Sequence, residues 1–199
     1  QIAEVVGVHE TTVSRAIARD YAGKEPVLVG VLQGAFVFMA DLVRAIPIDL
    51  ATDFISLSSY EGGTTSSGQV RLVSDLSMPI AGRHVLIVED LVDTGLTLEY
   101  LRRNFEARSP RSVRVCALAD KASHRQVETA VDYVGFAIPD VYVVGYGFDY
   151  EGLYRNLGQP AAGIGQHRRH RRHVVQHVGS DRRELRRRHT LGRKERYRR

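Results

Sequence analysis

The chain of 199 residues contains no tryptophan, two methionines and a single cysteine, Cys116. One cysteine cannot form a disulfide within the chain, which excludes the small disulfide-stabilised domains and favours a reducing compartment. The sequence has no run of about 18 consecutive apolar residues, the length expected of a membrane-spanning helix. The first ten residues also lack the basic start and long apolar stretch of a secretory signal. We therefore expect a cytoplasmic protein that does not enter the membrane.

Two common nucleotide-binding signatures are missing as well. The chain has no G-x-G-x-x-G pattern, and its turn at residues 93–97 lacks the lysine of a Walker loop. Rossmann dehydrogenases and P-loop nucleoside triphosphatases are therefore poor matches. The histidines His9, His84 and His124 show no metal-ligand spacing, and we interpret them as structural or exposed. Any phosphate or metal chemistry has to come from another pattern.

Charge is divided unevenly along the chain. The formal net charge is +5, yet residues 158–199 hold 14 Lys and Arg against 3 Asp and Glu. Residues 1–157 hold 14 Lys and Arg against 20 Asp and Glu, so the body of the chain is acidic. This division predicts a globular domain at 1–157 and an Arg/His-rich tail at 158–199, disordered or non-native.

Hydrophobic patterning predicts alternating strands and helices in residues 1–157. Unbroken apolar runs such as VLVGVL and HVLIVED are typical of strands buried on both faces of a parallel sheet. We expect helices at 1–24, 34–46 and 96–107, strands at 27–32, 48–60, 69–76, 84–90 and 112–120, short strands within 131–148, and a mobile loop at 61–68. This alternation predicts an α/β fold with a parallel sheet flanked by helices and a ligand site at the carboxyl ends of the strands.

The segment VLIVEDLVDTGLT, residues 85–97, carries the strongest chemical signal. A buried strand delivers Glu89 and Asp90 to its expected exposed end, and a turn with Thr94 and Gly95 then opens a helix. The N–H groups and positive dipole at a helix N-terminus suit a phosphate. Two carboxylates beside a phosphate would repel it unless they bind sugar hydroxyls or a divalent cation. The pattern therefore indicates a phosphate, a ribose and Mg²⁺.

This segment resembles the phosphoribosyl diphosphate (PRPP) motif of purine phosphoribosyltransferases. Four further segments, in the same order and at similar spacing, resemble the hypoxanthine–guanine type. They are VGVLQGAFVFMADLVRAI, DFISLSSYEGGTTSSG, the lysine of ALADK, and VGFAIPDVYVVGYGFDYEGLYRNL. The resemblance covers about residues 17–157 and implies a type I phosphoribosyltransferase fold. It places a small hood subdomain in the N-terminal segment and in residues after about 130.

The resemblance implies transfer of a phosphoribosyl group from PRPP to hypoxanthine or guanine, giving IMP or GMP and diphosphate, as a step of purine salvage. It makes Asp93 the catalytic general acid/base at purine N7. It implies that PRPP is bound by Gln33, Gly34, Glu89, Asp90, Asp93, Thr94, Gly95, Leu96, Thr97 and Arg155. It implies a purine site of Lys121, Tyr142, Val143 and Asp149, a Mg²⁺ held by Glu89, Asp90 and Asp149, and a closing loop that begins with Ser59 and Tyr60. It further implies a homodimer or homotetramer.

The chain departs from the family pattern in three places. Gln33 stands where the family's diphosphate turn usually has lysine, which predicts weaker binding of PRPP or diphosphate. The tail resembles an out-of-frame translation, and its alternative interpretation is a nucleic-acid-binding arm. Ala3, Gly7 and Val13 have the spacing of a helix-turn-helix unit, for which we favour a structural helix over DNA recognition. A nucleic-acid-binding regulator with the PRPP fold and a xanthine-preferring enzyme are the alternative functions.

Overall fold

The computed structural model describes residues 12–59 and 70–163. Tyr60, the loop at 61–68, most of the helix-turn-helix segment and the tail beyond 163 therefore lie outside the described residues. By its internal contacts the chain divides into residues 1–161 and 162–199. Within the described ranges, no helix has the length and apolar character needed to cross a membrane.

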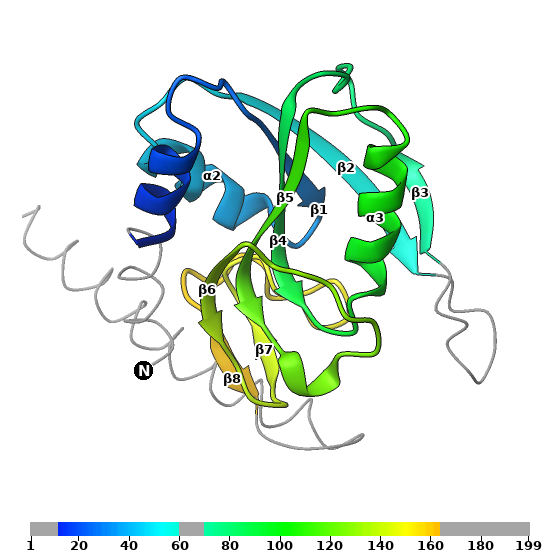
Figure 1. The fold of residues 1–199 in the computed structure, drawn as a ribbon. Coiled ribbons are helices and arrows are strands. Elements are labelled where there is room, and N and C mark those ends of the chain that lie inside the picture. Colours follow the sequence, from blue (N-terminus) through cyan, green and yellow to red (C-terminus); the bar gives the residue numbers. More distant parts are fainter. Residues whose placement is uncertain (1–11, 60–69, 164–199) are drawn as a thin grey trace, which may run out of the picture. The chain divides into compact units, whose positions relative to one another are not determined.

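A six-stranded sheet forms the centre of residues 12–161 (Figure 1). Its strands are β1 (Val27–Leu32), β2 (Ala51–Ser59), β3 (Val70–Ser74), β4 (His84–Val92), β5 (Ser112–Asp120) and β6 (Tyr133–Ala137). Their order in the sheet is β3-β2-β1-β4-β5-β6. All neighbours pair in parallel except β2 and β3, which pair antiparallel. The predicted α/β class with a mostly parallel sheet is confirmed.

Helices cover both faces of this sheet. Residues 12–20 form a helix, and it lies with α2 (Phe36–Ala45) on one face, while α3 (Leu96–Glu106) lies on the other (Figure 1). A short 3-10 helix, η1 (Ala122–His124), follows β5. The parallel strands between these helices read as continuous apolar runs because side chains on both of their faces are buried. This layering brings the carboxyl ends of β1, β4 and β5 to one edge.

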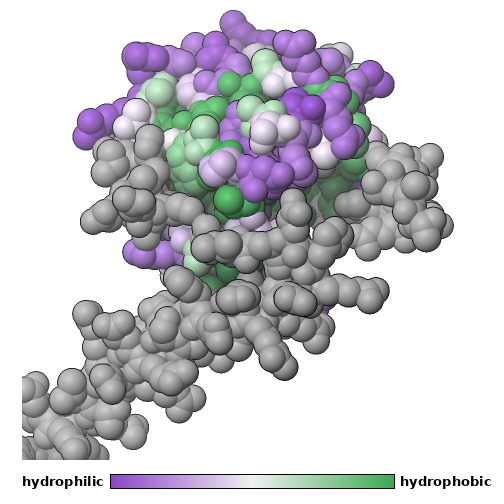
Figure 2. Space-filling model, turned by 90° about the horizontal axis from the view of Figure 1, so that it is seen from below, coloured by the Kyte–Doolittle hydropathy of each residue, from purple (hydrophilic) through white to green (hydrophobic). Residues whose placement is uncertain are grey.

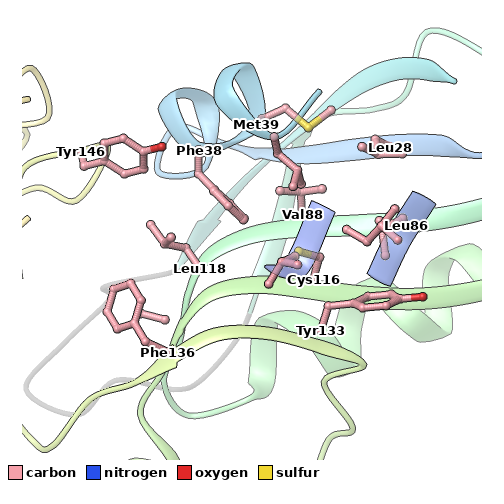
Figure 3. Packing of buried hydrophobic residues seen from close by; sticks show 14 of the residues in the cluster. Leu28, Phe38, Met39, Leu86, Val88, Cys116, Leu118, Tyr133, Phe136 and Tyr146 are labelled. Carbon is pink, nitrogen blue, oxygen red and sulfur yellow. The ribbon is translucent and has the colours of Figure 1, made fainter. Parts of the chain in front are cut away.

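The face under α2 has its own hydrophobic core. Phe38 and Met39 of α2 pack with Leu28, Leu86 and other buried side chains from the sheet (Figure 3). Ile17 and Tyr21 from the N-terminal helical segment belong to the same cluster. That helix therefore packs in the same cluster as side chains of the main sheet and of the segment at 143–148.

The face under α3 is packed by a second cluster, in which Phe105 is fully buried. We expect Phe105→Ala to lower the free energy of unfolding by about 3–5 kcal/mol, because the substitution removes a ring from a close-packed site and leaves a cavity. Urea unfolding followed by far-ultraviolet circular dichroism measures this change. Val73→Ala is the control, because Val73 is 62% exposed and its loss should change stability by less than about 0.5 kcal/mol. Equal effects of the two substitutions would contradict the packing described here.

The region after residue 130 divides between two sheets. β6 is an edge strand of the main sheet, so a hood that begins at about 130 is incorrect. β6 joins the main sheet because it pairs in parallel with β5, and the sequence pattern alone could not predict this pairing. The separate two-stranded sheet contains only β7 (Tyr142–Val144) and β8 (Ala161–Gly163). Because β8 lies within the predicted tail, at least residues 161–163 have regular structure.

Candidate active site

The acidic pair lies in the second half of β4, before the end of the strand. The strand continues to Val92, two residues beyond its predicted end, so Glu89 and Asp90 are not at an exposed terminus. Glu89 is 6% exposed. Burial, reinforced by the neighbouring charge of Asp90, raises the pKa of Glu89 well above its usual range. The expectation of an exposed strand end is wrong because β5 pairs with β4 as far as Val92 and extends it.

The pKa of Asp90 is also raised by burial. Burial raises the pKa of Asp90 to about 6, Arg155 opposes the increase, and Asp149 adds to it. Gly34 lies so close that a Cβ atom at this position would overlap with the Asp90 carboxylate. The turn after β1 therefore lies directly against the end of β4. Several carboxylates are held close together there, in a region that would be stabilised by a cation.

The turn between β4 and α3 is fixed by contacts to the segment after η1. The backbone carbonyl of Thr94 accepts hydrogen bonds from the N–H groups of Gln126 and Val127 at 2.9 and 3.1 Å. Gly95, the residue before α3, has φ +87°, and a Cβ atom there would lie 2.6 Å from the Val127 carbonyl oxygen. Only glycine satisfies both the left-handed conformation and this close approach. The turn is consequently preorganised by backbone contacts.

Two adjacent cavities open at this edge of the sheet. The larger, of about 320 Å³, lies between the turn after β1 and the end of β4, with Gln33, Glu89, Thr97 and Arg155 among its lining residues. The smaller, of about 180 Å³, lies beside Asp93 and Lys121 and beneath β7 residues. Asp90, Leu91 and Asp149 line both cavities. The arrangement therefore offers two neighbouring binding spaces with carboxylates at their boundary.

The smaller cavity combines apolar walls with a few polar groups. Lys121 is buried, at 7% exposed, and its Nζ lies 3.2 Å from Oδ1 of Asp140. Tyr142 is half exposed, and its ring makes an edge-to-face contact with Tyr150, with centroids 5.6 Å apart. A flat, partly apolar space with one buried cationic donor suits a planar heterocycle with an acceptor at its edge.

A turn after β7 closes the larger cavity. Arg155 donates from Nη1 to the Gly147 carbonyl oxygen at 2.6 Å and lies 2.6 Å from Asp149 through Nη2. The other Asp149 oxygen accepts the N–H of Gly152 at 2.7 Å. Nε of Arg155 is buried and makes no hydrogen bond within the described part of the chain. This guanidinium group therefore keeps a donor for an anionic ligand.

The structure brings most of the predicted site residues together. Those that line the larger cavity are Gln33, Gly34, Glu89, Asp90, Thr97, Asp149 and Arg155. Those that line the smaller one are Asp90, Asp93, Lys121, Tyr142, Val143 and Asp149.

Three predicted PRPP-binding residues, Thr94, Gly95 and Leu96, line neither cavity. Leu96 lines a separate cavity beside α3. Ser59 is the last residue of β2, and Tyr60 lies outside the described residues. The roles of all these residues stay predictions.

Two residues at the site were missed by sequence reasoning. His124 lies with its Nδ1 3.2 Å from Oδ1 of Asp93 and its Nε2 3.2 Å from Oδ2 of Asp140. The interpretation of His124 as merely structural or exposed is therefore incomplete, although the side chain is 49% exposed. Its position three residues after Lys121, just past a strand end, was the only available signal.

The surface around these strand ends is chemically mixed. Viewed from below, where the parallel strands end, the coloured part of the molecule shows hydrophilic and hydrophobic residues side by side (Figure 2).

Comparison with known proteins gives a consistent result. The family described as "Phosphoribosyl transferase domain" matches residues 10–151. A hypoxanthine-guanine phosphoribosyltransferase of Streptococcus pneumoniae is 50% identical over 141 residues, which cover 71% of this chain and 78% of that protein.

Two solved structures agree with this assignment. A hypoxanthine-guanine phosphoribosyltransferase from Bacillus anthracis, with a HEPES molecule in its active site, is 42% identical, with a TM-score of 0.77 and coverage of 81% of this chain and 95% of that one. The hypoxanthine phosphoribosyltransferase of Trypanosoma cruzi, in complex with the product IMP, is also 42% identical, with a TM-score of 0.74 and the same coverage. Fold, motif order and sequence identity agree, and the chain belongs to the phosphoribosyltransferase family, as a transferase of the hypoxanthine-guanine type.

Proposed function

We propose that this chain joins hypoxanthine or guanine to PRPP, giving IMP or GMP and diphosphate in a Mg²⁺-dependent reaction. The observation that carries the proposal is the pair of cavities that share Asp90, Leu91 and Asp149. The larger would take the ribose and diphosphate, and the smaller would take the purine. The shared boundary is where a bond between ribose and purine would form.

The donor set at the larger cavity fits Mg²⁺. Glu89 and Asp90 supply hard carboxylate oxygens, and burial together with mutual repulsion makes their charged forms costly without a cation. Within the described residues, no group of three metal-ligating side chains comes together. This agrees with Mg²⁺, which is usually held by one or two carboxylates together with substrate oxygens and water. When bound, the ion would neutralise charge that develops on the leaving diphosphate.

Asp149 would take part in metal binding only after a rearrangement. Its two oxygens already contact Arg155 and the N–H of Gly152. Diphosphate would compete with Asp149 for the Arg155 guanidinium, because arginine binds phosphate oxygens as well as carboxylates in a bidentate manner. We expect Arg155 to turn towards diphosphate, which would free one Asp149 oxygen.

Asp93 and Lys121 would act on the purine. Asp93 would accept the proton from purine N7 as N9 bonds to the ribose. Lys121 would donate a hydrogen bond to the 6-oxo group, and the 6-amino group of adenine would instead oppose one donor with another. Because the buried Lys121 donor would be left without an acceptor, we expect 6-oxopurines to be preferred over adenine by about 10⁴-fold.

The proposal is tested by incubating the purified full chain with PRPP, Mg²⁺ and each of hypoxanthine, guanine, xanthine and adenine. We expect nucleotide formation with hypoxanthine or guanine and almost none with adenine. Xanthine as the best substrate would support the alternative specificity. Turnover of adenine alone would overturn the role of Lys121. A homodimer or homotetramer and a cytoplasmic location stay predictions, which size-exclusion chromatography with light scattering and cell fractionation would test.

Gln33 is the one predicted diphosphate contact that departs from the family pattern. Its side chain is exposed and lines the larger cavity. We expect Gln33→Lys to lower the KM for PRPP several-fold, because a cation beside the diphosphate adds a charge-assisted hydrogen bond. Initial rates at varied PRPP concentration measure this, with the purine KM as the internal control. An unchanged KM for PRPP would indicate that the turn binds through its backbone alone.

A further inference from the structure

His124 lies between two carboxylates that belong to different turns. Its Nδ1 is 3.2 Å from Oδ1 of Asp93, and its Nε2 is 3.2 Å from Oδ2 of Asp140. The other Asp140 oxygen lies 3.2 Å from Nζ of Lys121. The proposed base and the proposed purine donor are thus connected through one imidazole ring and one carboxylate.

Backbone contacts fix the main chain that carries this ring. The N–H of His124 donates to the Lys121 carbonyl oxygen at 3.1 Å, which closes the single turn of η1. Immediately afterwards, Gln126 and Val127 donate to the carbonyl oxygen of Thr94, the residue next to Asp93. The main chain at His124 is therefore anchored between the end of β5 and the turn after β4, within reach of Asp93.

The donors and acceptors of His124, Asp93 and Asp140 leave room for one additional proton, between Nδ1 of His124 and Asp93. A neutral imidazole has one N–H donor and one acceptor nitrogen. If Nε2–H donates to Asp140, the lone pair of Nδ1 faces Asp93. Oδ1 of Asp93 is buried and makes no hydrogen bond among the described residues. The 3.2 Å approach of Nδ1 is therefore a close contact and not a hydrogen bond in this structure, and it would become a hydrogen bond when one of the two atoms carries a proton and the groups align.

We propose that His124 positions Asp93 and accepts, at Nδ1, the proton that Asp93 removes from the purine; this inference rests on the proposed function. In the first transfer N9 bonds to ribose C1′ as the C1′–O bond breaks and its electron pair leaves with diphosphate, the purine N7–H bond breaks with its electron pair staying on the ring, and an O–H bond forms on Asp93. In the second, that O–H bond breaks and Nδ1–H forms. Asp93 is again a carboxylate, and the imidazolium lies between Asp93 and Asp140.

The surroundings of His124 suit this second transfer. The two carboxylates stabilise the imidazolium, while Lys121 shares the charge of Asp140 through its other oxygen. The neighbouring Arg125 pairs with Asp120 and so has its own counter-ion. The His124 side chain is 49% exposed, which allows the proton to pass to water.

The test compares His124→Ala and His124→Asn with the unmodified full chain in single-turnover nucleotide formation. Asparagine retains a polar atom near Nδ1 but cannot take up the proton. We expect both variants to be about tenfold slower or more, a modest share of what acid–base catalysis contributes. Added imidazole should accelerate His124→Ala, since the ring site is open to solvent, and should leave the unmodified chain unchanged. His84→Asn is the matched control, because His84 is bonded to Ser112 at the opposite end of β4.

The outcomes separate this inference from the proposed function. A His124→Asn variant that reacts at the unmodified rate would overturn the proton transfer, and so would a slow His124→Ala variant that imidazole does not accelerate. Either result, together with normal nucleotide formation by the unmodified chain and slow reaction of Asp93→Asn, would leave the proposed function intact. Failure of the unmodified chain to form nucleotide would overturn both.

Discussion

Replacing Asp93 by asparagine is expected to lower kcat by about 10²–10⁴-fold, the range that a positioned acid–base group contributes. Asparagine has nearly the same size but cannot take a proton from the purine. Asp93 lines only the smaller cavity, so the KM for PRPP should change little. Steady-state kinetics with hypoxanthine and PRPP measure both quantities. A loss confined to the KM for PRPP would instead assign Asp93 to phosphate binding.

Asp75→Asn provides the control for this substitution. Asp75 is a partly exposed carboxylate that pairs with Arg108 at 2.9 Å and lines neither cavity. Surface ion pairs contribute at most about 1 kcal/mol, so this variant should retain stability and activity. An equal loss of kcat in the two variants would mean that Asp93 has no particular role in the reaction.

Replacing Gly147 by alanine should lower kcat/KM by about 10²-fold, because small displacements of positioning groups have effects of that size. Gly147 has φ +103°, and a Cβ atom there would overlap with the carbonyl oxygen of Gly34. The carbonyl group of Gly147 also accepts the hydrogen bond from Arg155. The added methyl group would therefore separate the turn after β1 from the turn that carries Asp149 and Arg155. Kinetics at varied PRPP concentration would detect the loss.

Two other glycines distinguish steric overlap from backbone strain. Gly152 also has a positive φ, +76°, but a Cβ atom there would have no neighbour within 4 Å. Gly158 has neither constraint. We expect Gly158→Ala to be neutral and Gly152→Ala to reduce stability modestly, with activity largely retained. If Gly152→Ala lost as much activity as Gly147→Ala, strain in this segment would explain both results, and contact with Gly34 would not.

The local pattern of apolar residues was sufficient to predict the bounds of the buried strands and of the two helices that cover them. β1 and β5 have the bounds that their apolar runs predict, and α2 and α3 agree within two residues. The turn at 93–97 was predictable for the same reason, because a strand, a glycine and a helix follow one another within a few residues. The segment that carries the motif was therefore placed at the correct edge of the sheet, and its chemistry stays a prediction.

Features that depend on contacts distant in sequence were not predictable. The antiparallel pairing of β3 depends on β2, and the place of β6 depends on β5. Asp53 is buried at 7% exposed because the N–H groups of Ser77 and Met78 reach back to it across 24 and 25 residues. His124 was missed because its partners, Asp93 and Asp140, come from two other segments. The periodicity of apolar residues contains no information on such contacts between distant segments.

The lone thiol gives the molecule a practical property. Cys116 lies on β5 beneath α2, fully buried, and burial raises the pKa of its thiol above the ordinary range. Since the thiolate is the nucleophile, this side chain should remain inert to maleimides while the fold is intact. A cysteine introduced at an exposed position such as Val73 would then be the single reactive handle. A fluorophore or spin label could be attached there without removing the native sulfur, and the label would report on motions at the edge strand beside the active site.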